Sequence, residues 1–411
     1  VPYQVQRNAW RILPPKGKTM SDQTTETAQD ETSKSGLISR FFKETELDTR
    51  LLGMIGALAL IWTGFHFYGA FFNGFGAFLT PRNLWNLSVQ TASIGIMATG
   101  MVLVIITRNI DLSVGSVLGF CAIVMGVVQV YILPQYLGLG HPMIWVIAVL
   151  VGVVCGAFIG AFHGFLIAYG NIPAFIVTLG GLLVWRGAAF LVARGETISP
   201  VDPTFALMGG GPYGAIGSTG SWIVGILGCA AVLGLIAIGR RNRRIFHIEQ
   251  RPIWAETFLA VVGCGAVIGA VLLVNAYPWP RGIVKRYAEQ EGITVPETGL
   301  FISHGFAIPV LILIAVAIFM TILMSRSRFG RYVYAIGGNP EAAALAGINT
   351  QMMTVKIFAV MGALTGLSAV VASARLGSAT NALGTLDELY VIAAAVIGGT
   401  SLSGGVGTIY G

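Results

Sequence analysis

The sequence of 411 residues is apolar and sparsely charged. Hydrophobic residues make up 55% of it, charged residues 10%, and the mean hydropathy is +0.77. An average soluble protein carries about 25% charged residues, so this composition excludes an ordinary soluble domain and predicts an all-α protein that crosses the lipid bilayer several times. The net charge of +7 is explained by basic residues in short loops and does not indicate nucleic-acid binding.

Residues 1–50 are polar, carry mixed charge and contain no apolar run. This pattern predicts a soluble, disordered N-terminal tail. Met20 opens a stretch typical of a protein start, which leaves Val1 or Met20 as the true beginning. No cleavable signal peptide is predicted, because the first apolar stretch is too long and lacks a small-residue cleavage site.

Residues 51–411 are interpreted as one transmembrane domain. A helix needs about 20 apolar residues to cross a bilayer, and nine stretches approach or exceed that length. The predicted spans are 51–72, 84–107, 112–132, 143–169, 172–194, 221–238, 257–276, 305–324 and 354–372. A shorter apolar stretch at 389–397 runs into glycines, so we expect about nine or ten spans.

The distribution of lysine and arginine predicts the orientation, because cytoplasmic loops carry an excess of these residues. A cytoplasmic N-terminus puts 18 of the 25 lysines and arginines inside and six outside. In this orientation residues 195–220 and 277–304 form two larger loops on the outer side.

The span predicted at 143–169 carries a glycine at every fourth position, namely Gly152, Gly156, Gly160 and Gly164. In water each would cost a helix roughly 1 kcal/mol relative to alanine. In lipid, small residues at this spacing allow two helix backbones to approach closely. The stripe therefore predicts a close helix–helix contact.

The sequence predicts no metal site and no cofactor. Its four cysteines lie in apolar segments without metal-ligand or disulfide spacing, and its five histidines are scattered. We interpret the cysteines as small packing residues. They are Cys121, Cys155, Cys229 and Cys264.

The polar stretch "NPEAAALAG" reads as a complete short helix. Asn339 is a good N-cap, Pro340 suits the first helical position, and Glu341 complements the positive helix end. Ala342–Ala346 would form the body, and Gly347 would end it. Two turns of helix do not persist alone in water. The helix therefore rests on its own bundle or docks on a partner, and the residues alone leave both open.

The stretch "GGNPEAAALAGI" resembles the cytoplasmic coupling loop, here about residues 325–353, of ABC importer permeases of the simple-sugar family (ribose, arabinose, xylose). The stretches "TRNIDLSVGSVLG", "IPAFIVTLGGLLVWRGAAFLV" and "ARLGSATNALGTLDELYVIAAAVIGGTSLSGGVGTIYG" resemble the same family. The resemblance covers most of residues 84–411 in order. Residues 240–300, with their additional span, are more similar to the xylose branch.

The resemblance implies a permease subunit in a bacterial inner membrane that imports a monosaccharide, xylose or a related pentose. It also implies a separate ATPase that binds the coupling helix, a periplasmic sugar-binding protein and a homodimer, with no catalytic residue in this chain. Carried over by motif, the coupling positions are Glu341, Ala342, Ala343 and Gly347, within the cap set by Asn339 and Pro340. The family continues beyond "GGVGTIYG" with further apolar helices, so we expect the chain to be a fragment or truncated.

Two glycine-interrupted segments, 109–119 and 399–411, share a Leu-Ser pair followed by a glycine. Such segments in two halves of a transporter mark the transport pathway. The predicted pathway residues are Asp111, Ser113, Gly115, Ser403 and Gly405, together with Arg186 inside a span. Alternatively, Asp111 is the N-cap of a helix that begins at Leu112. Arg186 would pair with an acid, Asp387 or Glu388, or with backbone carbonyls.

Two other classes of protein compete with this interpretation. An ion-coupled secondary sugar carrier usually needs carboxylates or histidines within its spans, and the acids between residues 51 and 238 all lie near predicted span ends. A membrane enzyme would need a zinc signature, a nucleophile elbow or paired carboxylates, and the sequence contains none of these motifs.

Overall fold

The computed structural model describes residues 41–42, 44–46, 49–293, 296 and 299–410. The proposed start at Met20 and nearly all of the expected tail lie outside these residues. Within the described part of the chain the regular structure is helical, with three isolated β-bridges and no strand. The all-α prediction is confirmed.

Nine helical spans among the described residues are long and apolar enough to cross a membrane, and each coincides with a predicted one. They are α3 (Thr49–Asn73), α4 (Pro81–Ile106), α5 to α6 (Val114–Leu137), α7 (Met143–Tyr169), α8 (Ala174–Ala193), α10 (Gly217–Ile245), α11 (Ile253–Asn275), α13 (Ile308–Arg326) and α16 (Thr350–Leu376). The third consists of α5 (Val114–Val127), the π-helix η1 (Val128–Ile132) and α6 (Leu133–Leu137).

The apolar stretch at 389–397 forms α17 (Asp387–Ile397), which has 11 residues. At 1.5 Å per residue it is about 16 Å long, which is about half of a bilayer core. The tenth apolar stretch is therefore a half-length helix.

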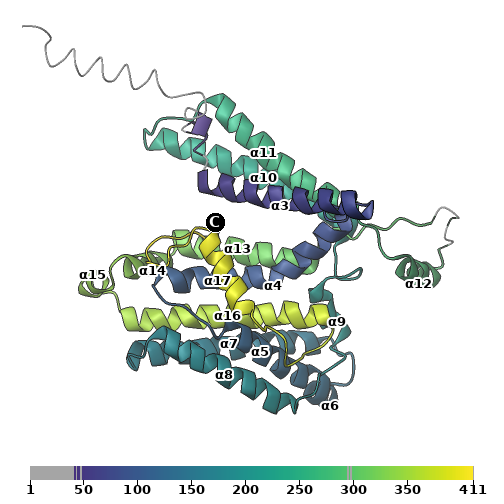
Figure 1. Cartoon of the computed structure of the whole chain (residues 1–411), viewed down its shortest axis with the longest axis horizontal. Helices are drawn as coiled ribbons and strands as arrows, with labels where there is room; N and C mark the ends of the chain where they lie inside the picture. Colours follow the sequence, from purple (N-terminus) through teal and green to yellow (C-terminus); the bar gives the residue numbers. More distant parts are fainter. Residues whose placement is uncertain (1–40, 43, 47–48, 294–295, 297–298, 411) are drawn as a thin grey trace, which may run out of the picture.

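Five short helices lie between or beside the spans. They are α9 (Pro203–Ala206), η2 (Leu207–Gly209), α12 (Arg281–Glu291), α14 (Arg328–Gly338) and α15 (Pro340–Leu345). Figure 1 shows α14 and α15 at one end of the molecule and α12 at the other. We refer to these as the α15 end and the α12 end. The predicted assignment of the α15 end to the cytoplasm remains a prediction.

The glycine stripe of α7 lies directly against α16, as its spacing predicted. A side chain on Gly156 would overlap the carbonyl of Gly362, and one on Gly160 would overlap the carbonyl of Phe358. Gly362 faces Gly156 in return. The two backbones touch at these positions, which is the geometry that small residues permit between membrane helices.

Helices α4 and α16 form the centre of the bundle, and most of their residues are buried. The helices α10 and α11 pack against each other apart from this centre, as Figure 1 shows at its top. Their surfaces and that of α3 are largely exposed and apolar. Exposed apolar faces of this extent fit contact with lipid.

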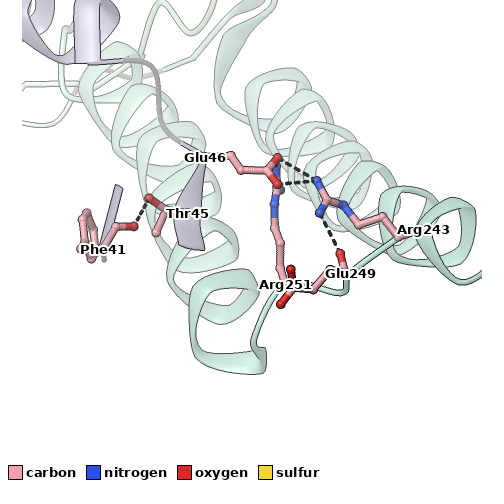
Figure 2. Close-up of polar contacts among 6 residues, drawn as sticks. All are labelled: Phe41, Thr45, Glu46, Arg243, Glu249 and Arg251. Carbon is pink, nitrogen blue, oxygen red and sulfur yellow. Dashed lines mark hydrogen bonds and ion pairs between the residues drawn. The ribbon is translucent and has the colours of Figure 1, made fainter. Parts of the chain in front are cut away.

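Residues 41–42 and 44–46, which the sequence assigned to the tail, pack on the α10–α11 hairpin. The Glu46 carboxylate lies 2.7 Å from the Arg243 guanidinium and 2.6 Å from that of Arg251 (Figure 2). These hydrogen bonds lower the pKa of Glu46 below its ordinary value of 4.5. The ring of Phe41 stacks on Trp254 with the centroids 5.9 Å apart. The chain is therefore held to this hairpin before α3 begins.

Candidate functional site

The short helix predicted from "NPEAAALAG" is present as α15. The Asn339 side chain accepts a hydrogen bond from the Ala342 amide at 3.0 Å, and Pro340 occupies the first turn. At the other end the amide of Gly347, at φ 85°, donates to the carbonyl of Ala344. The Ile348 amide donates to the carbonyl of Ala343. This pair of bonds is a Schellman motif, so both ends of the helix are fixed.

Of the two supports that the sequence left open for α15, the structure shows contact with the protein's own bundle. Ala343 is buried against the bundle, whereas the side chain of Leu345 is 91% exposed. Glu341, Ala342 and Gly347 are also exposed. One face of the helix therefore rests on the protein, and the opposite face remains available for contact.

A cavity of about 670 Å³ lies beside α15, between the ends of α4 and α7 and the start of α16. About half of the residues that line it are polar. They include Thr107, Asn109, Asn171, Asn349 and Gln351. We call it the inner cavity, because it lies at the α15 end.

A second cavity of about 480 Å³ lies toward the other end of α4 and α16 and is closed on one side by the loop 377–386. Polar side chains from both helices and from the loop line it. They are Gln90, Thr91, Ser93, Arg375, Thr380 and Thr385, and they are joined by Asp387, the first residue of α17. We call it the outer cavity. None of these side chains was predicted as a pathway residue, although Asp387 was considered as a partner of Arg186.

Buried contacts between α4 and α16 separate the two cavities. The Ser93 hydroxyl donates to the Ser368 hydroxyl at 2.7 Å, and the Ser368 hydroxyl donates to the Ser93 carbonyl at 2.8 Å. From Ile94 at the outer cavity to Thr107 at the inner one, 13 residues of nearly continuous helix span about 20 Å. The arrangement is two polar chambers on either side of a tightly packed helix pair.

The predicted role of Asp111 as a helix N-cap is wrong. The helix α5 begins at Val114 rather than Leu112, and the position before it is Ser113. The Asp111 carboxylate accepts hydrogen bonds from the Ser113 amide at 2.8 Å and from its hydroxyl at 2.6 Å. Because Asp and Ser favour such local bonds, they fix a turn and delay the start of the helix by two residues.

Arg186 pairs with backbone carbonyls, one of the two partners that its position allowed. Its Nη1 donates to the carbonyls of Asn381 and Leu383, each at 2.7 Å. Neither acid proposed as a partner, Asp387 or Glu388, lies within ion-pair distance among the described residues. Arg186 therefore anchors the loop that closes the outer cavity.

The structure brings four of the six predicted pathway residues into one region and separates the other two. Ser113 lies against Gly181 of α8, and Gly115 lies against Gly384 and Glu388, beside the loop that Arg186 holds. Ser403 is exposed, and the Gly405 amide donates to the carbonyl of Ile106 at the α15 end.

The chain was compared with known proteins. A family model described as "Branched-chain amino acid transport system / permease component" matches residues 83–411. The chain belongs to this family. It is therefore a component of a transport system and a multi-pass inner-membrane permease, as its motifs predicted.

Several curated relatives are sugar permeases. The xylose transport system permease protein XylH of Escherichia coli is 36% identical over 82% of this chain and 76% of its own length. XylH of Haemophilus influenzae is 35% identical over 82% of this chain and 80% of its own length. The ribose import permease protein RbsC of Escherichia coli is 30% identical over 81% of this chain and 74% of its own length. No solved structure matches the chain. The resemblance to sugar permeases is thus confirmed.

Proposed function

We propose that this permease is the membrane-spanning subunit of an ATP-driven importer for a monosaccharide, xylose or a related pentose. The relatives named for xylose transport are 35–36% identical to it, whereas the ribose permease is 30% identical. Hydroxyl, amide and charged groups in the outer cavity suit a ligand that is covered with hydroxyls. The sugar enters at the outer cavity and leaves through the inner one.

The single observation that carries the coupling proposal is α15 itself. A helix of six residues that is capped at both ends is a rigid body, and its exposed face carries small residues and Leu345. Small side chains let a partner backbone approach closely. We assign this face to a separate cytoplasmic ATPase, which moves α15 when it binds and hydrolyses ATP.

Two further partners complete the proposal. A periplasmic binding protein delivers the sugar at the α12 end, and two copies of the permease form a homodimer. When a separate protein supplies specificity, the permease needs only a hydrated path that releases the sugar.

The experiment is uptake into proteoliposomes that contain the permease, a co-purified ATPase and a binding protein. Radiolabelled xylose, ribose and galactose are compared with and without ATP inside the vesicles. We expect xylose uptake that requires the ATPase and ATP and is unaffected by a proton uncoupler. Uptake by the permease alone that the uncoupler abolishes would instead indicate an ion-coupled carrier.

A further inference from the structure

The seven residues between α4 and α5, 107–113, form a non-helical stretch that runs from the α15 end into the bundle. Thr107, Asp111 and Ser113 are buried. Ser113 lies beside Gly181 and His163. Gly181 is seven residues from the start of α8, and His163 is six residues from the end of α7. At 1.5 Å per residue this is about 10 Å from those helix ends. We call this stretch the connecting segment.

At the α15 end, the connecting segment is hydrogen-bonded to the residues that precede α15. The Arg108 Nε donates to the carbonyl of Gly337 at 3.0 Å, and its Nη2 donates to that of Gly338 at 2.6 Å. Gly338 is followed directly by Asn339, the N-cap of α15. A guanidinium on carbonyls at a helix C-terminus is a charge-assisted contact in a favourable field.

The stretch that follows α17 also contacts Arg108 and the end of α4, through Gly404 and Gly405. The Gly405 amide donates to the carbonyl of Ile106 at 2.9 Å. Gly404 has φ 85°, and a side chain there would overlap the stem of Arg108. Arg108 itself has φ 62°, a conformation that non-glycine residues rarely adopt. The surroundings therefore hold Arg108 in one pose.

The deep end of the connecting segment is tied to α7 and α8 by a chain of hydrogen bonds. The Trp185 indole can only donate, so its Nε1, at 2.9 Å, donates to Nε2 of His163. His163 then carries its proton on Nδ1, which donates to the Ser113 hydroxyl at 3.3 Å. The Ser113 hydroxyl in turn donates to Asp111. Every bond in this chain has a fixed direction.

Directly after its deep end the chain reaches the wall of the outer cavity. A side chain on Gly115 would overlap the carbonyl of Gly384, and Gly384 lines the outer cavity together with Leu383. The carbonyl of Leu383 is one of the two that Arg186 holds. Contacts therefore continue from the N-cap of α15 to the loop that closes the outer cavity.

We infer that the connecting segment transmits displacement of α15 to the outer cavity, with Arg108 as the positioning residue at one end and Ser113 at the other. Hydrogen bonds fix the segment at both ends, so a displacement of one end is passed to the residues that the other end contacts. This inference rests on the proposed coupling of α15 to an ATPase.

The test measures ATP hydrolysis by the assembled transporter, with and without sugar-loaded binding protein. In Arg108→Ala we expect an unchanged basal rate of ATP hydrolysis. The stimulation by sugar-loaded binding protein should fall about tenfold, a size common for coupling between sites. Arg108→Lys, which keeps one charged donor, should recover part of it. Arg328→Ala is the matched control, because Arg328 is exposed at the start of α14 and has no side-chain partner among the described residues.

The double variant Arg108→Ala/Ser113→Ala separates transmission from a merely structural role. If both residues act in one route, the double variant loses no more stimulation than the worse single variant. Fully additive losses, or normal stimulation in Arg108→Ala, would overturn the inference. A wild-type transporter whose hydrolysis does not respond to the loaded binding protein would instead refute the proposed function.

Discussion

Gly115 and Gly384 face each other so closely that neither position has room for a side chain. Gly115 lies in the first turn of α5, after the non-helical stretch that follows α4, and Gly384 lies in the loop that follows α16. The start of α5, which directly follows one irregular stretch, thus meets a second irregular stretch inside the bundle. Backbone of this kind is tolerated at membrane depth only where protein surrounds it or a cavity adjoins it.

This contact predicts that Gly115→Val prevents the outer cavity from closing normally. Overpacking of a well-packed site costs about 1–3 kcal/mol, so we expect a lower melting temperature in detergent and strongly reduced sugar uptake. Gly187→Val on α8 is the control, because nothing lies within 4 Å of a side chain there. Equal behaviour of the two variants in both measurements would contradict the importance of the contact.

The contact between α7 and α16 predicts a larger loss. In Gly160→Ala the new methyl group would meet the carbonyl of Phe358, a backbone atom that cannot turn away. We expect poor insertion and a lower yield of folded protein, measured by size-exclusion chromatography. Gly265→Ala on α11 has open space around it and should be neutral or stabilising by up to about 1 kcal/mol. A well-folded Gly160→Ala protein would show that the helices can separate.

A substitution at Gly347, which ends α15, should uncouple ATP hydrolysis from sugar transport although the new side chain meets no other atom. Gly347 has φ 85° with nothing within 4 Å of a side chain, so Gly347→Val acts only through backbone strain, about 1–2 kcal/mol. We expect normal membrane insertion and sugar-stimulated ATP hydrolysis near the basal rate. Gly347→Asn should be milder, since asparagine tolerates this conformation. Normal stimulation in Gly347→Val would argue against coupling through α15.

The Glu46 contact predicts a loss of structure in acid. Its pKa is lowered by Arg243 and Arg251, so the contact stabilises the folded state above the ordinary pKa. The stabilisation disappears as the pH falls through the lowered value. The protection of the amides of residues 44–46 against hydrogen exchange, relative to an unstructured peptide at the same pH, should therefore fall as the pH drops below the ordinary pKa of 4.5.

Glu46→Gln should show low protection of residues 44–46 at every pH. Glu249→Gln is a matched control, because only the backbone carbonyl of Glu249 contacts Arg243 (Figure 2). Full protection of residues 44–46 at all pH values in Glu46→Gln would mean that the contact of Phe41 with Trp254 holds this stretch without the ion pairs.

The outer cavity predicts a transport defect without a coupling defect. Gln90→Leu keeps the approximate volume of a lining side chain but removes its hydrogen-bonding groups. We expect a several-fold higher KM for sugar uptake, from the loss of a hydrogen bond worth about 1 kcal/mol, and unchanged basal ATP hydrolysis. Thr63→Val on the exposed helix α3 should leave both unchanged. An unaltered KM in Gln90→Leu would place the sugar elsewhere.

Local chemistry explains why so much of the fold was predictable. The spans follow from runs of apolar residues, α15 from an N-cap and a terminal glycine, and the contact of α7 from glycine spacing. Each signal lies within about 30 consecutive residues. The start of α5 was misplaced because Asp111 and Ser113 bond to each other, a choice between two local hydrogen-bond patterns that the sequence does not decide.

The candidate site was less predictable, because its contacts join distant parts of the chain. The partners of Arg108 are 229 and 230 residues away, and from the sequence it counts only as one cytoplasmic charge. The outer cavity had a weak signal in Gln90, Thr91 and Ser93, three polar residues within an apolar span. That signal does not say which helix faces them.

The interlocked glycines of α7 and α16 also restrict how the protein can move. Two helices whose backbones touch over several turns cannot slide or tilt relative to each other without a collision of main-chain atoms. During a transport cycle they must therefore move as one rigid unit. The motion has to come from the elements around that unit, namely α4, α5 and the two irregular stretches.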